Sequence, residues 1–465
     1  MDDGYRIEKD SMGEVKVPEP VYYGAQTVRA RDNFPISGIR MPTAFIRVLG
    51  NVKKAAAEVN LQLGLLPRDI ADAILSAADE VVDGKMDDEF VVDVFQTGSG
   101  TSTNMNMNEV IANRASELMG GSRGQKEPVH PNDHVNRGQS SNDVIPTAIH
   151  VVLLQESEKL LVPRLLELAD VLGKKADEFD VVVKIGRTHL QDATPIRLGQ
   201  EFSGYEAMVR DGIERIRASY PRLSELAIGG TAVGTGINTH PRFGEMMAER
   251  ISALTGHSFV EAKNHFAAQG SRDAVVEFSG ALKTLAVSLM KIGNDVRWLG
   301  SGPRCGIGEI SIPELQPGSS IMPGKVNPVL AESLVQVAAQ VIGNDAAVTI
   351  GGMSGNFELN VMMPMMLHNT LQSVQLLANV CAVFTENCVR NITADEERCR
   401  SFVEQSLAMC TALVPEIGYD SAAKIAQDAW KSGKTVRQVV LEQAIIPEKQ
   451  VGKLLDPLSM TKPEK

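Results

Sequence analysis

The chain has 465 residues, and at roughly 150 residues per domain this length suggests about three structural units. Apolar residues make up 43% and charged residues 22%, as in an ordinary globular protein, and the formal net charge is −12. That charge argues against a general nucleic-acid binder, which needs a basic face to displace counterions. No apolar run approaches the roughly 20 residues that a bilayer requires, so the sequence also excludes a membrane-spanning protein.

The cysteines and the N-terminal residues indicate the compartment. The first residues have neither the basic and apolar regions of a signal peptide nor the composition of a transit peptide. The spacing of the five cysteines favours buried, reduced thiols over a disulfide framework, and it provides neither an iron–sulfur motif nor a zinc knuckle. We therefore expect a cytoplasmic protein without a metal site. The cysteines are Cys305, Cys381, Cys388, Cys399 and Cys410.

The N-terminal part, residues 1–139, is interrupted by proline and glycine and is predicted to be a mixed, mainly helical domain. Apolar residues at steps of three and four predict one helix between Pro42 and Gly64. The same pattern predicts a shorter helix between Pro67 and Gly84.

From Ser140 onward the sequence is dominated by long helical patterns. Residues 281–290 are apolar on more than one face, and a helix of this kind must be surrounded by other helices. We therefore predict a central helical bundle over residues 140–392 that is shared between subunits. Pro146 and Pro163 predict a turn or kink in the first pattern. The predicted helices cover about 142–179, 200–226, 271–299, 328–350 and 365–390.

Residues 393–465 are predicted to form a small helical C-terminal domain. The Thr-Ala-Asp-Glu sequence at 393–396 matches a capping box, which predicts that a helix follows Thr393. The tail after Lys453 is polar, and we expect it to fray. The fold class is thus mostly α, with domains at 1–139, 140–392 and 393–465.

Four loops are rich in glycine and in small hydroxyl or amide side chains, and they are candidates for ligand binding. Free N–H groups at a helix N-terminus carry partial positive charge, and serine, threonine and asparagine add short donors. One such loop alone would be read as helix N-caps. Four of them, with Lys325 and His189 embedded, favour a site for a small dianion. The loops cover residues 97–106, 139–143, 186–192 and 318–328.

Two nucleotide-binding motifs are present only in part. The Gly433-Lys434-Thr435 sequence lacks the upstream glycine of a P-loop, and the glycines at 98 and 100 lack the third glycine of a dinucleotide fingerprint.

Glu332 follows Lys325 by seven positions, and a carboxylate there could orient a histidine such as His189. The sequence alone does not establish that pairing.

The Gly-Ser-Ser-Ile-Met-Pro-Gly-Lys-Val-Asn-Pro sequence at 318–328 closely resembles the signature of the aspartase/fumarase superfamily. The similarity extends to residues 6–13, 23–27, 229–236 and 301–310, and essentially the whole chain looks like a class II fumarase. The competing family is aspartate ammonia-lyase. Three segments look like the fumarase form instead: His-Pro-Asn-Asp at 130–133, Ser-Ser-Asn-Asp at 140–143, and residues 355–361.

The resemblance implies a three-domain helical subunit in a homotetramer, with each active site built from loops of three subunits. It also implies a cofactor-independent and iron-independent lyase of the tricarboxylic acid cycle that hydrates fumarate reversibly to L-malate. The alternative activity is that of an aspartate ammonia-lyase. A structural oligomer that has lost its chemistry is a further alternative, but the chemical residues of the motif are all present.

By the same resemblance, Ser319 is the proton-abstracting base and His189 the acid-side partner, oriented by Glu332. Lys325 and Asn327 stabilise the charge of an aci-carboxylate intermediate. The resemblance further implies a second dicarboxylate site at His130, Asn132 and Asp133. A local hydrogen-bonding role for His130 stays open, because Glu127 stands where some relatives have an arginine. The residues implied to bind the substrate are Ser99, Thr101, Ser140, Ser141, Asn142, Thr188, Ser320, Lys325 and Asn327.

Overall fold

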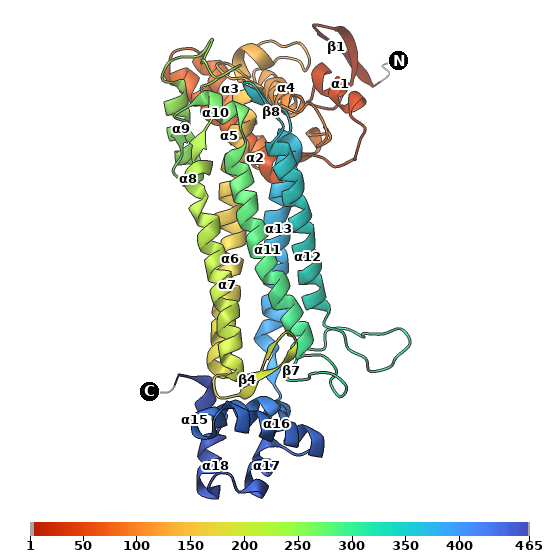
Figure 1. Cartoon of the computed structure of the whole chain (residues 1–465). Helices are drawn as coiled ribbons and strands as arrows, with labels where there is room; N and C mark the ends of the chain where they lie inside the picture. The colour runs from red at the N-terminus through yellow and green to blue at the C-terminus, as the bar shows by residue number, and fades with distance from the viewer. Residues whose placement is uncertain (1–3, 464–465) are drawn as a thin grey trace. The chain divides into compact units, whose positions relative to one another are not determined.

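The structure is a computed structural model that describes residues 4–463 (Figure 1). It divides into two compact units, and the segments of each alternate along the chain. Unit 1 comprises the chain up to Val162, together with Glu214–Thr284 and Gln340–Leu376. Unit 2 comprises Pro163–Ile213, Leu285–Ala339 and the chain from Leu377 onward. The three domain ranges taken from the sequence remain a prediction.

The described residues are mostly helical, which confirms the predicted fold class. Their strands are short and pair only in twos, with five antiparallel or parallel pairs. The antiparallel pairs are β1 (Tyr5–Asp10) with β2 (Gly13–Pro18), β3 (Val183–Thr188) with β4 (Gln191–Arg197), β7 (Ile310–Ser311) with β10 (Thr393–Ala394), and β8 (Gly355–Asn356) with β9 (Leu359–Asn360). The parallel pair is β5 (Glu225–Leu226) with β6 (Val260–Glu261).

In unit 1, the two predicted N-terminal helices form as α2 (Thr43–Gln62) and α3 (Arg68–Val82). Phe45, Leu49 and Val52 are fully buried, as the apolar periodicity of α2 requires. That helix packs against α3, α5 and α9, so it lies at the centre of this unit. The other helices of unit 1 outside the predicted long patterns are α1 (Ala25–Asn33), α4 (Thr101–Leu118), α8 (Tyr220–Leu223), α9 (Phe243–Thr255) and α10 (His265–Gly270).

The long helical patterns form close to their predicted ranges. The first is continuous through Pro146 but changes to a π-helical turn at Ser157–Leu161. Pro163 lacks the N–H that would bond to the carbonyl of Lys159, so an irregular turn is expected there. The long helices are α5 (Ser141–Glu156), α6 (Val162–Glu178), α7 (Leu198–Ala218), α11 (Asp273–Leu299), α12 (Val329–Gly352) and α13 (Met363–Asn387).

Buried polar contacts fix how these helices pair within each unit. In unit 1, Ser279 Oγ and Lys283 Nζ of α11 donate to Asp345 of α12 at 2.8 and 2.6 Å. In unit 2, the Tyr205 hydroxyl of α7 donates to Asp295 of α11 at 3.0 Å. A buried polar group that finds its partner in only one alignment selects the register of two apolar helices.

The C-terminal residues of unit 2 form a helical cluster with its own apolar core, drawn in blue in Figure 1. The predicted capping box at Thr393 is wrong by two residues, because Thr393 pairs in β10 and the Asp395 side chain caps the helix by accepting from the Arg398 N–H. The cluster contains α14 (Glu396–Gln405), α15 (Val414–Ile417), α16 (Tyr419–Ser432), α17 (Val436–Gln443) and α18 (Glu448–Leu454).

The tail does not fray as predicted, up to the last described residue. Leu455 is buried in the apolar core of the cluster. The carbonyl of Thr461 accepts a hydrogen bond from Gln200 Nε2 at 2.9 Å. Apolar side chains spaced along a polar tail therefore suffice to dock it. Within residues 4–463, no helix is long and apolar enough to cross a membrane.

His150 on α5 makes stability depend on pH. Burial, together with the positive charge of Arg272, lowers the pKa of His150 to about 4. A histidine in the unfolded chain keeps a pKa near 6.5, so between about pH 6.5 and pH 4 the folded state binds fewer protons than the unfolded state. The free energy of unfolding therefore decreases as the pH falls through this range, by about 3 kcal/mol for this group.

We expect His150→Gln to remove that part of the pH dependence. The measurement compares urea unfolding of the wild type and the variant at pH 7 and pH 4.5. His257→Gln, on the loop after α9, is the control and keeps the wild-type dependence. The same loss of stability in His150→Gln and the wild type would contradict the assignment.

Candidate active site

The first candidate loop, predicted over residues 97–106, is shorter in the structure, because α4 begins at Thr101 and only residues 97–100 form the loop before it. Gly100 adopts φ 72°, a left-handed conformation that glycine takes without strain, and it directs the chain into the helix. Ser99 Oγ and Thr101 Oγ1 lie 2.7 Å apart. The N-cap residue Gly100 has no side chain, and Gln96 Oε1 accepts from the Thr103 N–H at 2.9 Å, which leaves the N–H groups of Thr101 and Ser102 for an anion.

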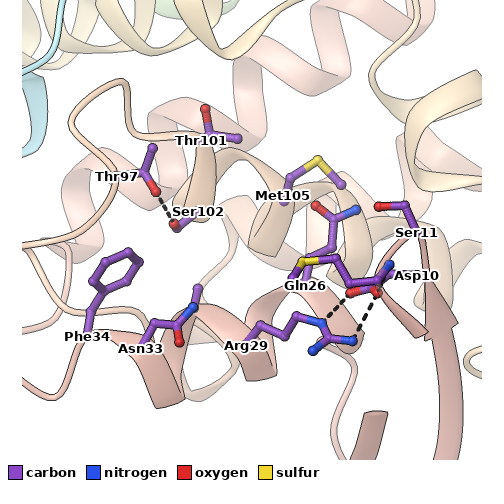
Figure 2. Close-up of a pocket in the computed structure, with 12 residues that line it drawn as sticks. Asp10, Ser11, Gln26, Arg29, Asn33, Phe34, Thr97, Thr101, Ser102 and Met105 are labelled. Atoms are coloured by element: carbon purple, nitrogen blue, oxygen red, sulfur yellow. Dashed lines mark hydrogen bonds and ion pairs between the residues drawn. The ribbon is translucent and has the colours of Figure 1, made fainter. Parts of the chain in front are cut away.

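A cavity of about 340 Å³ lies beside this turn, with Thr101 and Ser102 in its lining (Figure 2). Arg29 also lines the cavity, but its Nε and Nη2 donate to the Asp10 carboxylate at 2.7 and 3.1 Å, and Nη2 also donates to the Gly13 carbonyl at 3.3 Å. The hydrogen bond from Arg29 lowers the pKa of Asp10, so the pair stays ionised. The cavity therefore offers hydroxyl and amide groups with a compensated charge.

The second candidate loop forms the N-terminus of α5, and residues 140–142 are called the 140–142 turn below. Ser140 caps the helix: its Oγ accepts from the Asn142 N–H at 3.2 Å, and its own N–H donates to Asp143 Oδ1 at 2.9 Å. Asn104 Nδ2 of α4 donates to Ser141 Oγ at 3.1 Å. Unit 1 thus brings the first two predicted loops together.

Asp143 joins the 140–142 turn to the loop at residues 229–232. Its Oδ2 accepts from the N–H groups of Gly229 and Thr231 at 3.2 and 2.8 Å. Asn142 Nδ2 adds a bond to the carbonyl of Ala232 at 2.8 Å. Burial raises the pKa of Asp143 to about 6. These contacts hold the turn rigid from its buried side.

In unit 2, His189 lies at the tip of the β3–β4 hairpin. Thr188 pairs with Gln191, so the hairpin turn consists of His189 and Leu190. Both have left-handed backbones, with φ 56° and 60°. Tight hairpins require this conformation but favour asparagine and glycine for it, so two other residues here store strain. Strained, exposed residues of this kind are enriched at functional sites, and the side chains of Thr188 and His189 are exposed.

Buried charges hold the base of this hairpin. Arg187 forms a two-point contact with Glu309, from Nη1 to Oε2 at 2.8 Å and from Nη2 to Oε1 at 3.0 Å. Lys184 Nζ lies 3.2 Å from Glu309 Oε2 and 3.3 Å from Glu201 Oε2. Sequence reasoning missed this network, because nothing local indicates that residues 122 positions apart form a pair.

The fourth candidate segment, residues 318–327 of unit 2, is called the 318–327 loop. Ser319 Oγ accepts from the N–H groups of Ile321 and Met322 at 3.2 and 2.8 Å. Lys325 Nζ donates to Asn327 Oδ1 at 2.8 Å. Gly318 packs against the Lys325 carbonyl so closely that any Cβ there would overlap it. The loop is thereby closed onto itself, and Lys325 and Asn327 line a cavity of about 320 Å³.

Within the described residues, no hydrogen bond or ion pair joins Glu332, in the first turn of α12, to His189. The same holds between the hairpin tip and the 318–327 loop. Unit 2 thus carries the predicted acid–base residues on separate segments. Their pairing remains a prediction.

The predicted second site forms a π-helical turn at Pro131–Val135 in unit 1. His130 Nδ1 accepts from the N–H groups of Asn132 and Asp133, both at 3.1 Å. This is the local hydrogen-bonding role that the sequence left open. Asn132 and Asp133 also line a cavity of about 640 Å³, together with Arg137.

Comparisons with known proteins agree on one family. The model of the Lyase family matches residues 13–343, and that of the fumarase C C-terminus matches residues 409–462. The chain is 58% identical to the class II fumarate hydratase of Halobacterium salinarum, over 99% of this chain and 98% of that protein. It is 55% identical to the mitochondrial fumarate hydratase of Danio rerio, over 99% of this chain and 91% of that protein. The crystal structure of a class II fumarase from Schistosoma mansoni superposes with a TM-score of 0.97 at 40% identity, covering 99% of this chain and 100% of that chain.

The Arg187–Glu309 contact is expected to hold the hairpin tip in its strained conformation. Lysine cannot reproduce a two-point contact with a carboxylate, so Arg187→Lys should loosen the tip. We expect amide hydrogen exchange at residues 188–190, measured by mass spectrometry, to become at least 10-fold faster. This corresponds to a decrease of roughly 1.4 kcal/mol or more in the free energy of local opening.

Arg197→Lys is the matched control for this prediction. Arg197 lies on the same hairpin and pairs with the exposed carboxylate of Asp180. Surface pairs of this kind contribute little to stability. Equal exchange rates in the two variants would show that the buried contact does not hold the tip.

Proposed function

The chain belongs to the class II fumarase family of the aspartase/fumarase superfamily, and we propose how its own residues carry out the family reaction. That reaction is the reversible hydration of fumarate to L-malate. When the reaction starts from L-malate, a base removes a proton from the carbon next to a carboxylate, and a hydroxyl group then leaves from the neighbouring carbon. The intermediate is an aci-carboxylate that carries additional negative charge.

Ser319 is the proposed base, and the single observation that supports this role is the pair of N–H groups that point at its Oγ. A serine hydroxyl is too weakly acidic to act as a base at neutral pH unless its alkoxide is stabilised. Donors from Ile321 and Met322 favour the charged form over the neutral one. The Lys325 ammonium in the same loop adds positive charge.

Lys325 and Asn327 are proposed to stabilise the aci-carboxylate. Both line the cavity beside the 318–327 loop, and their contact with each other pre-orients them. Donors that are fixed before the reaction stabilise developing charge without reorganisation. The substrate carboxylates are proposed to be bound by the hydroxyl and amide groups that the sequence indicated: Ser99, Thr101, Ser140, Ser141, Asn142, Thr188 and Ser320.

The remaining roles depend on assembly. His189 is proposed to protonate the leaving hydroxyl group and Glu332 to orient it, with the two residues supplied by different subunits. A homotetramer whose active sites are shared by three subunits satisfies this requirement. Exposed apolar side chains on the long helices, Val287 of α11 and Ile350 of α12 among them, support such an assembly.

Two further features complete the proposal. The five cysteines are free, and three of them are buried, which fits the reducing cytoplasm as the compartment. The second dicarboxylate site is proposed at the cavity beside Asn132 and Asp133, with His130 holding the turn. Arg137, which lines that cavity, would supply the cation that Glu127 cannot.

Activity towards L-malate and L-aspartate separates the family reaction from its alternative. We expect the purified protein to form fumarate from L-malate, detected by ultraviolet absorbance, and to form none from L-aspartate. Fumarate from L-aspartate with release of ammonia would make the chain an ammonia-lyase. Silence with both substrates would support the structural oligomer.

Ser319→Ala tests the base. A positioned general base contributes about 10²–10⁴-fold to the rate, so we expect kcat for L-malate to fall by that factor. KM should change little, and size-exclusion chromatography with light scattering should give the same mass as the wild type. Ser401→Ala, an exposed serine on α14 of unit 2, is the control with normal turnover. Near-normal kcat in Ser319→Ala would remove Ser319 from the role.

A further inference from the structure

Lys53 is a buried cation on α2, inside unit 1, and no motif pointed to it. Its side chain is fully buried. Its Nζ donates to Asn136 Oδ1 and to Gln139 Oε1, both at 3.0 Å. No carboxylate lies within ion-pair distance of it among residues 4–463. A buried ammonium that is bonded only to amide oxygens has lost its hydration without gaining a negative charge beside it, and this costs free energy unless an anion compensates the charge.

The partners of Lys53 lead directly to the 140–142 turn. Gln139 immediately precedes Ser140, and its carbonyl accepts from Asn136 Nδ2 at 3.1 Å. Asn136 Oδ1 also accepts from Asn104 Nδ2 at 3.2 Å, and the same amide of Asn104 donates to Ser141 Oγ. Lys53 is therefore connected to Ser140 through Gln139 and to Ser141 through Asn136 and Asn104.

The electrostatics around Lys53 suit an anion at the turn. Burial lowers the pKa of Lys53 to about 7, and the charge of Asp143 opposes this shift. Asp143 is itself saturated by the N–H groups of Ser140, Gly229 and Thr231. With a pKa of about 7, Lys53 is only partly protonated near neutral pH, and a carboxylate bound at the N-terminus of α5 would favour its charged form and be stabilised by it.

We propose that Lys53 is a positioning residue for substrate binding: through Asn136 and Gln139 it holds the 140–142 turn in the geometry that receives a substrate carboxylate. This inference rests on the proposed function of that turn. Lys53 does not touch the substrate and takes no part in proton transfer. Its effect is on the affinity for dicarboxylates.

The test uses the full-length protein with Lys53→Met, which keeps the length of the side chain and removes its charge and donors. We expect KM for both fumarate and L-malate to rise at least 10-fold, with a smaller change in kcat. The inhibition constant of succinate, a dicarboxylate that cannot react, should rise by a similar factor. Lys54→Met is the matched control and behaves as wild type, because Lys54 is the next residue and pairs with Asp79 at the surface of unit 1.

A double-mutant cycle separates positioning from a merely structural role. Gln139→Met removes the other end of the contact and should also raise the succinate constant at least 10-fold. The double variant should be no worse than the more affected single variant, because both act through one contact. If Lys53→Met does not fold, Gln139→Met alone decides, with wild-type mass and melting temperature as the criterion of folding.

Succinate constants within twofold of wild type in the folded variants would overturn the inference, and so would a loss confined to kcat. Multiplicative effects in the double variant would overturn it as well, since they would show independent roles. Failure of the proposed function is distinguishable, because the wild-type protein would then not interconvert fumarate and L-malate.

Discussion

The candidate site depends on one constraint: a loop that binds an anion must leave its own donors free and still be rigid. In each unit a buried carboxylate meets this constraint by taking up donors on the inner side of the loop. Asp143 accepts three N–H groups below the 140–142 turn, and Glu309 accepts Arg187 and Lys184 below the hairpin that carries His189. These carboxylates do not bond to the hydroxyls of Ser140, Ser141 or Thr188, so those donors remain for a ligand on loops that are already ordered, and binding costs little ordering of the loop.

This arrangement also explains how a chain with a formal charge of −12 can bind a dianion. At long range the net negative charge repels a dianion, so affinity has to come from short-range donors and from a few cations close to the ligand. Arg29 and Arg187 are neutralised by Asp10 and Glu309, and they therefore serve the structure. Lys325 bonds to the amide oxygen of Asn327, and Lys53 bonds to those of Asn136 and Gln139. Neither lysine forms an ion pair with a carboxylate among residues 4–463, so an anion can still pair with each of them.

The sequence predicted the fold well where it could be read locally. Apolar periodicity bounded by glycine and proline placed α11, α12 and α13 within about three residues of their observed ends. The predicted helix over 200–226 ended too late, because the chain leaves α7 at Ala218 and enters a strand at Glu225. The capping box at Thr393 failed for a similar reason: β10 pairs with β7, which lies more than 80 residues earlier in the chain. Local patterns carry no information about such partners.

The site followed the same division. Loop composition and the family resemblance pointed to Ser319, Lys325 and His189 as candidates, because their residue types suit the proposed chemistry. They could not identify Glu309 or Lys53, because a charged residue in a helical or strand pattern reads as solvated until its burial is known. Burial changes the meaning of such a residue: an unsolvated charge is tolerated only where its partners repay the loss of water. The residues proposed to hold the reacting groups in place are thus hard to recognise in the sequence. In the structure they stand out as buried charges whose cost the packing of the fold alone does not explain.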